Sequence, residues 1–176
     1  MPQVVITAVG PDRPGLVDEL TAFLLEVGAN VADSSMVNLG GQFALLMLVQ
    51  ISKDRIATVQ TDTSDVGRRI GLAVTVSADT LQTDNPITTS GMAYLLKVRA
   101  MDQPGIVHRI THLLHDHHVN IEELQTRRQP GSVAGTPLFN MELRMTVPPD
   151  VLPKTLRLEL QQLCNSLNCD AELTTH

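Results

Sequence analysis

The sequence of 176 residues predicts an α+β fold in which one small unit, ordered strand, helix, strand, strand, helix, strand, occurs twice. An internal repeat carries this prediction: Asp12-Arg13-Pro14-Gly15-Leu16-Val17 aligns with Asp102-Gln103-Pro104-Gly105-Ile106-Val107 at a shift of ninety positions. Without a gap, the same shift also aligns Thr21 with Thr111, Leu24 with Leu114 and Asn30 with Asn120. Turn residues and apolar residues therefore stay in register, which indicates two copies of one fold.

Each copy is predicted to open with a strand and a helix. Val4–Val9 and Tyr94–Ala100 are rich in apolar residues, several of them β-branched, which favours strands. A D-x-P-G turn follows, and then a helix whose apolar residues fall within one arc of about 100°. These residues are Leu16, Leu20, Phe23, Leu24 and Val27 in the first copy, and Ile106, Val107, Ile110, Leu113 and Leu114 in the second.

A β-hairpin is predicted to follow in each copy. Gly28 ends the first helix, and Gly40-Gly41 forms the turn between strands near Val31–Leu39 and Gln42–Ile51. In the second copy the connection between the hairpin strands is longer and runs from Arg128 to Pro137.

The second helix and the last strand complete each copy. A regular apolar stripe predicts the helix of the second copy, formed by Leu152, Leu156, Leu160, Leu163 and Leu167. The corresponding stripe of the first copy is less regular and consists of Ile56, Val59, Val66 and Ile70. We therefore expect an irregular segment around Thr61–Ser64 in that helix. The last strands are expected at Leu72–Ser77 and Ala171–Thr174.

This order of elements is that of a ferredoxin-like βαββαβ unit, with an antiparallel sheet and both helices on one face. We expect the first domain at residues 1–80 and the second at 92–176. Residues 81–91, within a stretch rich in Thr, Asp and Ser, form the predicted linker. Because a small open sheet exposes its edge strands unless they are paired, we also expect a homodimer.

Composition excludes several classes of function. Thirteen basic and nineteen acidic residues give a net charge of -6, which disfavours direct binding of nucleic acid. The low aromatic content of 2% also disfavours an RNA-recognition module. No apolar run reaches the roughly 18 residues of a membrane span, and Met1–Gly10 lacks the pattern of a secretory leader. We therefore expect a cytoplasmic protein with no membrane partner.

The repeated D-x-P-G turn is the candidate functional motif. Proline suits the first turn of a helix, where its missing N–H is not needed, and Asp12 or Asp102 is expected to accept hydrogen bonds from the free N–H groups there. A helix N-terminus also attracts a carboxylate. Asn30 and Asn120 have donor and acceptor atoms that match the ammonium and carboxylate groups of one small molecule. The alternative is an ordinary capped turn followed by an asparagine at the helix exit.

At these residues the sequence resembles ACT domains, which are small-molecule-sensing modules of amino-acid metabolism. The resemblance rests on the D-x-P-G turns, the following helices and the exits Gly28-Ala29-Asn30-Val31 and Val119-Asn120-Ile121. It covers nearly the whole chain. More narrowly, Asp33-Ser34-Ser35-Met36 and Gly135-Thr136-Pro137-Leu138-Phe139, together with the first turn, resemble the group of glycine cleavage system transcriptional repressors.

The resemblance implies two sites for a small amino acid, each at an interface between two domains. By position, one site contains Asp12, Arg13, Pro14, Gly15, Leu16 and Asn30. The other contains Asp102, Gln103, Pro104, Gly105, Ile106 and Asn120. The copies differ at Arg13 and Gln103, so the two sites need not bind equally well. The resemblance further implies that the protein inhibits a DNA-binding transcription regulator and that glycine, or a similar amino acid, relieves this contact.

Other functions remain as alternatives. The first is a regulatory subunit of an amino-acid biosynthetic enzyme. The second is a small metal-dependent hydrolase, because His108, His112 and His115 share one helix face and imidazole binds zinc or nickel. No cysteine completes that set, and Asp116 is expected to point elsewhere, so a solvated or subunit-facing helix surface is the preferred interpretation. Cys164 and Cys169 are expected to be apolar packing residues. We expect no catalytic residues, no metal and no cofactor.

Overall fold

The computed structural model describes residues 2–77, 90–130 and 137–175. The chain divides into two compact units, Met1–Pro86 and Ile87–His176, which are treated separately below. Residues 81–89 of the predicted linker and residues 131–136 of the predicted long connection lie outside the described part.

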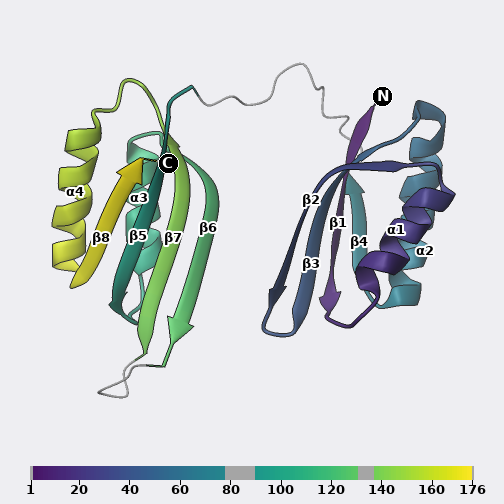
Figure 1. Ribbon diagram of the computed structural model, residues 1–176, viewed down its shortest axis with the longest axis horizontal. Helices are drawn as coiled ribbons and strands as arrows, with labels where there is room; N and C mark the ends of the chain where they lie inside the picture. The colour runs from purple at the N-terminus through teal and green to yellow at the C-terminus, as the bar shows by residue number, and fades with distance from the viewer. Residues whose placement is uncertain (1, 78–89, 131–136, 176) are drawn as a thin grey trace. The chain divides into compact units, whose positions relative to one another are not determined.

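The first domain has the predicted order of elements (Figure 1). They are β1 (Gln3–Pro11), α1 (Leu16–Glu26), β2 (Asn30–Leu39), β3 (Gln42–Gln50), the short 3-10 helix η1 (Lys53–Arg55), α2 (Ile56–Ile70) and β4 (Ala73–Ser77). The four strands form one antiparallel sheet in the order β2-β3-β1-β4.

The second domain repeats this architecture. Its elements are β5 (Met92–Met101), α3 (Ile106–Asp116), β6 (Asn120–Gln129), β7 (Leu138–Val147), α4 (Pro153–Ser166) and β8 (Cys169–Thr175). The sheet order is β6-β7-β5-β8, again antiparallel. The prediction of two βαββαβ units is therefore confirmed, with strand and helix positions close to those expected.

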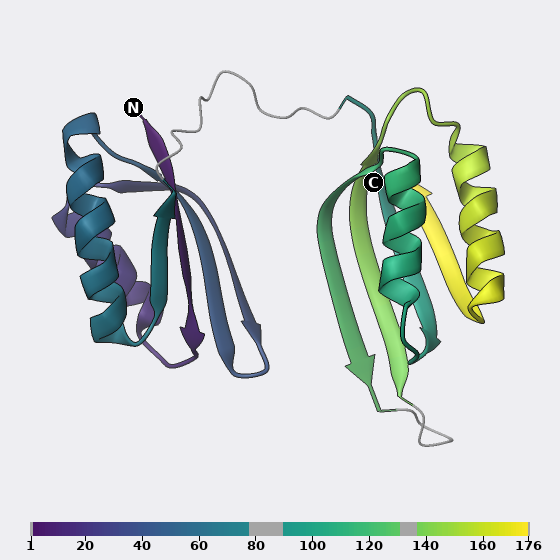
Figure 2. The same ribbon diagram turned by 180° about the vertical axis from the view of Figure 1, so that it is seen from behind.

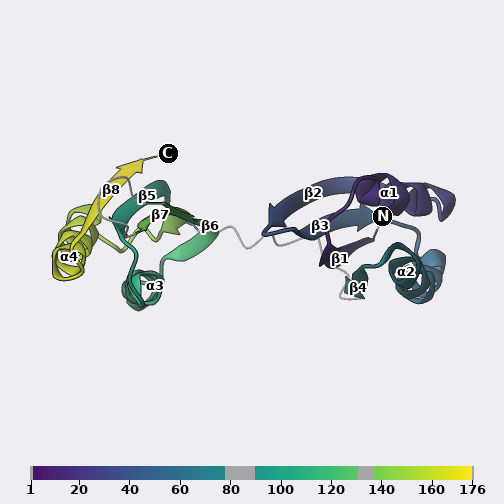
Figure 3. The same ribbon diagram turned by 90° about the horizontal axis from the view of Figure 1, so that it is seen from below.

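One face of each sheet packs against the helices and the other does not. Along β1, Val4, Ile6 and Ala8 are buried while the residues between them are not, as the period of a strand requires. Figures 1 and 2 show α1 and α2 together on one side of the first sheet, and Figure 3 shows α3 and α4 together on one side of the second sheet. Each sheet therefore has one helix-covered face and one face that we call the open face.

The helix α2 corrects one prediction, because it is continuous through Thr61–Ser64. The buried stripe of this helix includes Thr63, which is 1% exposed. Its hydroxyl donates a hydrogen bond to the carbonyl of Val59, so a polar residue can occupy an apolar position without an unsatisfied group. The expected irregularity came from counting threonine as polar.

Left-handed backbone positions recur in both domains, with different residues. Gly28 ends the first helix region with φ of 68°, and His118 occupies the same place in the second domain with φ of 53°. Gly71 and Asn168 form a similar pair after α2 and α4. Glycine adopts this conformation without steric cost, whereas histidine and asparagine do not.

Candidate functional site

The loop between β1 and α1 lies beside the turn that joins β2 to β3. The N–H of Asp12 donates to the carbonyl of Gly41 at 2.9 Å. In the second domain the N–H of Asp102 donates to the carbonyl of Pro137, also at 2.9 Å. The first loop residue is therefore held at the same end of the sheet in both copies.

Glycine is needed in this loop for its backbone conformation. Gly15 and Gly105 are the N-cap residues of α1 and α3, and both have φ of 93°. The helices begin at Leu16 and Ile106, each 2% exposed and therefore part of the hydrophobic core. Pro14 and Pro104 lie directly before the N-cap, so the prediction that proline occupies the first helical turn was wrong by two positions.

The prediction that Asp12 and Asp102 cap the helices was also wrong. No side chain hydrogen-bonds to the N-terminus of α1 or α3 as a cap. The carboxylate of Asp12 instead accepts a hydrogen bond from Asn38 Nδ2, and that of Asp102 lies 2.8 Å from Arg128 Nε. Each aspartate lies three residues before its N-cap, so it ties the loop to the neighbouring edge strand instead.

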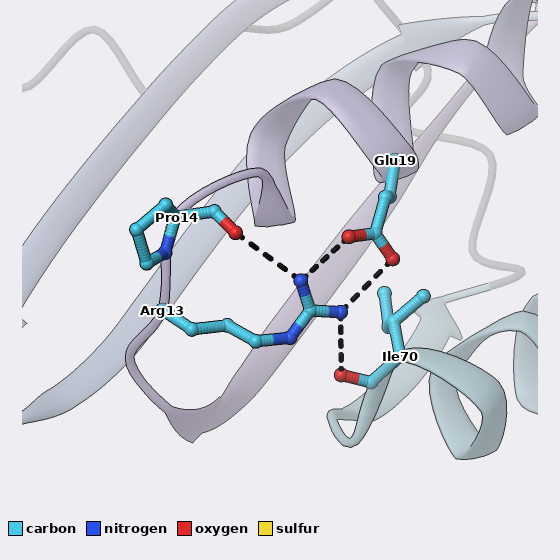
Figure 4. Close-up of polar contacts among 4 residues, drawn as sticks. All are labelled: Arg13, Pro14, Glu19 and Ile70. Atoms are coloured by element: carbon cyan, nitrogen blue, oxygen red, sulfur yellow. Dashed lines mark hydrogen bonds and ion pairs between the residues drawn. The ribbon is translucent and has the colours of Figure 1, made fainter.

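Arg13 forms the densest set of polar contacts in the first loop (Figure 4). Its guanidinium donates to both carboxylate oxygens of Glu19, at 2.6 and 2.9 Å, and to the carbonyls of Pro14 and Ile70, each at 3.2 Å. The hydrogen bond between the two side chains raises the pKa of Arg13 and lowers the pKa of Glu19 from its ordinary value. Arg13 therefore connects the loop to the first turns of α1 and to the end of α2.

Gln103 makes the equivalent long-range contact in the second domain. Its side-chain amide donates to the carbonyl of Leu167, which is the C-cap residue of α4. Ile70, the acceptor for Arg13, is the last residue of α2. Arg13 and Gln103 thus anchor their loops to corresponding helix ends, although only the first loop gains a positive charge.

Asn30 and Asn120 lie at the other end of their sheets. Asn30 is the first residue of β2 and pairs with Gln50, whereas Asn38, near the end of β2, pairs with Phe43 beside the turn. The eight residue steps from Asn30 to Asn38 correspond to roughly 26 Å of strand. Within one domain the structure therefore does not bring Asn30 together with residues 12–16, and a site that uses both must include a second domain.

Asn38 and Arg128 are loop neighbours that the sequence argument missed. Asn38 donates a hydrogen bond to Asp12, and Arg128 forms an ion pair with Asp102. The antiparallel hairpin predicted around Gly40-Gly41 pairs Asn38 with Phe43, which in turn pairs with Gly10 near the end of β1, so the register of that hairpin was the available signal.

The histidines of α3 lie on its exposed surface. His108 and His112 stack with ring centroids 5.8 Å apart, and His115 is also exposed. Asp116 Oδ2 lies 4.0 Å from His112 Nε2, so the expectation that Asp116 points elsewhere was wrong. Among the described residues, no group of three or more His, Cys, Asp or Glu side chains could hold a metal ion. His117, which the sequence argument did not single out, pairs with Glu159 of α4 at 2.5 Å.

The two cysteines are buried in the core of the second domain. Burial, followed by the neighbouring Cys169, raises the pKa of Cys164 to about 12. A thiol with such a pKa stays protonated at neutral pH and is a poor nucleophile. No helix in the described part of the chain is both long and apolar enough to cross a membrane.

A groove on the open face of the second sheet was not predicted. It is lined by Lys97, Arg99, Gln125, Arg127, Asn140 and Glu142, among others. Lys97 and Glu142 form an ion pair at 3.5 Å across neighbouring strands. This face is therefore polar and charged.

Both halves of the chain match known domain families. Residues 2–77 and residues 94–157 each match the ACT domain. The chain is 28% identical, over 170 residues, to the glycine cleavage system transcriptional repressor of Escherichia coli. The matched region covers 97% of this chain and 88% of that protein. A shorter relative, UPF0237 protein MJ1558 of Methanocaldococcus jannaschii, is 35% identical over 78 residues, or 43% of this chain and 87% of its own length.

Two solved structures are similar to this chain over almost its full length. The crystal structure of an unknown protein from Galdieria sulphuraria has a TM-score of 0.83 and 27% identity, and covers 99% of this chain and 98% of that one. The crystal structure of a protein described as a glycine cleavage system transcriptional repressor has a TM-score of 0.72 and 24% identity, covering 99% and 97%. The second likeness is evidence for the fold alone.

Proposed function

The chain belongs to the ACT domain family, which both of its halves match, and we propose that it is a regulatory protein that senses a small amino acid and controls transcription through a partner protein. Glycine or a similar amino acid is the proposed effector, and a DNA-binding transcription regulator is the proposed partner. The similarity to the glycine cleavage system transcriptional repressor of Escherichia coli over 97% of the chain supports a role in transcriptional control linked to glycine.

The paired loops are the structural observation that carries the sensing role. Gly15 and Gly105 have nearly identical backbone angles, with φ of 93° in both and ψ of -9° and -7°. Both helix N-termini lack a side-chain cap, which suits binding of a carboxylate by backbone N–H groups. We propose that residues 12–16 and 102–106 contact the ligand, and that Asn30 and Asn120 contribute from a second domain.

The charge of the chain supports regulation through protein contact instead of direct contact with DNA. A net charge of -6 opposes the counterion release on which binding to DNA depends. We therefore propose that the protein does not bind DNA directly. The alternative is a regulatory subunit of an amino-acid biosynthetic enzyme, and affinity purification from cells distinguishes the two by recovering a transcription regulator or an enzyme.

Thermal unfolding with each amino acid added separately tests the sensing role. A ligand present at about 100 times its Kd stabilises the folded state by roughly 2.7 kcal/mol, which raises the midpoint by several degrees. We expect such a rise with glycine or a close relative. No rise with any amino acid, in the presence of the recovered partner as well, would exclude a sensor of free amino acids.

Three variants assign the sites. Asn30→Ala and Asn120→Ala each remove a proposed ligand contact in one copy, and we expect the thermal shift to decrease in the variant whose copy binds. Arg13→Gln gives the first loop the residue of the second, and Gln103 shows that this residue still reaches the helix end. If Arg13 contacts the ligand, this variant weakens binding while the midpoint of the free protein stays close to that of the wild type.

A further inference from the structure

The open faces of the two sheets have the same backbone but opposite chemistry. On the first sheet, the open face carries Val5, Val9, Val37, Leu39, Leu46 and Leu48. At the corresponding positions, the second sheet has Leu95, Arg99, Arg127, Gln129, Glu142 and Arg144. Five of these six positions change from apolar to polar or charged. The second domain therefore shows that the same backbone can carry a polar, solvent-exposed open face.

The apolar side chains of the first open face are accessible in the isolated chain. Leu39 is 73% exposed, Val37 53%, Leu46 50% and Val9 43%. A shallow hollow on this face is lined in part by Val5, Leu46 and Leu48. A contiguous apolar surface of this kind marks an interaction site. Within β1 to β4, the charged residue on this face is Asp33 alone, at the bulge near the start of the edge strand β2.

Four charged side chains on the second open face form two ion pairs within that face. Lys97 pairs with Glu142 at 3.5 Å, and Arg144 pairs with Glu123 at 3.4 Å, each across neighbouring strands. Packing the apolar face against this surface would remove water from these charges and from Arg99 and Arg127 without offering them partners. The charged face is therefore a poor partner for the apolar one.

We infer that the open face of the first sheet is the interface through which two copies of this chain associate, with each apolar face packed on the other. The face is self-complementary in chemistry, since apolar residues meet apolar residues about 10 Å from sheet to sheet. Asp33 lies on the edge strand β2 and therefore at the rim of this interface. Charged side chains at the rim of an interface stay hydrated. This inference does not depend on which ligand the protein senses.

The size of the face is sufficient for a specific dimer. With strands about 4.8 Å apart and about 3.4 Å per residue, the nine, ten, nine and five residues of β1, β2, β3 and β4 give a face of roughly 540 Å². Burying this face on both copies removes roughly 1,100 Å² from water, which exceeds the roughly 1,000 Å² expected of a specific interface.

The second domain supplies the substitutions for the test. Thr7 pairs with Leu46 across β1 and β3, and the corresponding residues Lys97 and Glu142 form an ion pair. The double variant Thr7→Lys/Leu46→Glu therefore introduces charges that this backbone already holds in the other copy. Val37→Arg tests a separate strand, since Arg127 occupies the corresponding position. Leu25→Glu, on α1 and 78% exposed, is the matched control outside the face.

Sedimentation velocity of the full-length chain over a series of concentrations measures the outcome, with circular dichroism to confirm folding. We expect a dimer for the wild type and for Leu25→Glu, and a monomer for Thr7→Lys/Leu46→Glu and for Val37→Arg. A monomeric wild type overturns the inference. A dimer that persists in both folded variants also overturns it, and would assign association to edge-strand pairing, which these substitutions leave intact.

A second measurement needs no charged variant. In Leu46→Cys, the added thiol is accessible in the monomer, while Cys164 and Cys169 are buried. We expect its reaction with a maleimide to slow several-fold as the protein concentration rises and the dimer forms. A labelling rate that is unchanged while sedimentation shows dimer formation would place the interface elsewhere.

Discussion

Arg13 and Ile70 lie 57 positions apart, yet the guanidinium of Arg13 donates a hydrogen bond to the carbonyl of Ile70 at 3.2 Å. In the second domain Gln103 makes the same kind of bond to Leu167. A carbonyl at the end of a helix has no acceptor role within that helix, so a donor from the loop satisfies it. The residue after the loop aspartate therefore joins the candidate site to the end of the second helix in both copies.

We predict that Arg13→Ala lowers the thermal midpoint more than Arg13→Gln does. Alanine removes both the Glu19 contact and the bond to Ile70, whereas glutamine retains a donor that reaches the helix end, as Gln103 does. Differential scanning fluorimetry of the two variants beside Glu19→Gln, which removes the charge of the carboxylate but leaves Arg13 in place, checks this. Equal midpoints for Arg13→Ala and Arg13→Gln would show that the bond to Ile70 contributes nothing measurable.

We predict opposite effects for Gly28→Ala and His118→Gly. Gly28 has φ of 68°, and an added Cβ there would meet nothing within 4 Å, so the cost of alanine is backbone strain. We expect this variant to lower the free energy of unfolding by about 1 kcal/mol. His118 has φ of 53°, and replacing it with glycine relieves strain and raises the free energy of unfolding by up to about 1 kcal/mol. Urea denaturation measures both, and a loss of stability in His118→Gly would contradict the strain argument.

We predict that Gly67→Ala destabilises the first domain, although alanine is the better helix former. An added Cβ would lie 2.7 Å from the carbonyl oxygen of Leu72 and 2.8 Å from a methyl of Val74. Such overpacking costs about 1–3 kcal/mol, which exceeds the gain of about 1 kcal/mol from helix propensity. Thr61→Ala, on the exposed side of the same helix, is the control and should change the stability little. An unchanged urea midpoint in Gly67→Ala would mean that α2 can move away from β4 without cost.

We predict that the thiols of the folded protein react slowly at pH 8 and that stability falls at high pH. Because the pKa of Cys164 is raised to about 12 from its ordinary 9.0, folding favours the neutral thiol. Its contribution to stability is complete below about pH 9 and decreases as the pH rises towards 12, since the unfolded chain releases the proton first. Ellman's reagent checks the reactivity, with denatured protein as the control. Complete reaction of both thiols on mixing with the folded protein would contradict their burial.

The pattern of the sequence predicted the elements that depend on local periodicity. The repeat from Asp12 to Asn30 and from Asp102 to Asn120, together with the apolar stripes, was enough for two βαββαβ units. Predictions failed where they depended on the hydrogen-bond partner of a polar side chain. Thr63 can belong to a buried stripe because its hydroxyl donates a hydrogen bond within the helix. Asp12 does not cap the helix N-terminus, and its carboxylate instead accepts a hydrogen bond from Asn38 on the edge strand.

Fold and loop conformation were encoded locally, because strand and helix periods and the glycines of the two turns act over a few neighbouring residues. The contacts of Arg13, the separation of Asn30 from the loop, and the contrast between the two open faces were decided by tertiary structure. Those features depend on which strands become neighbours and in which register, and residues far apart in the chain settle that together.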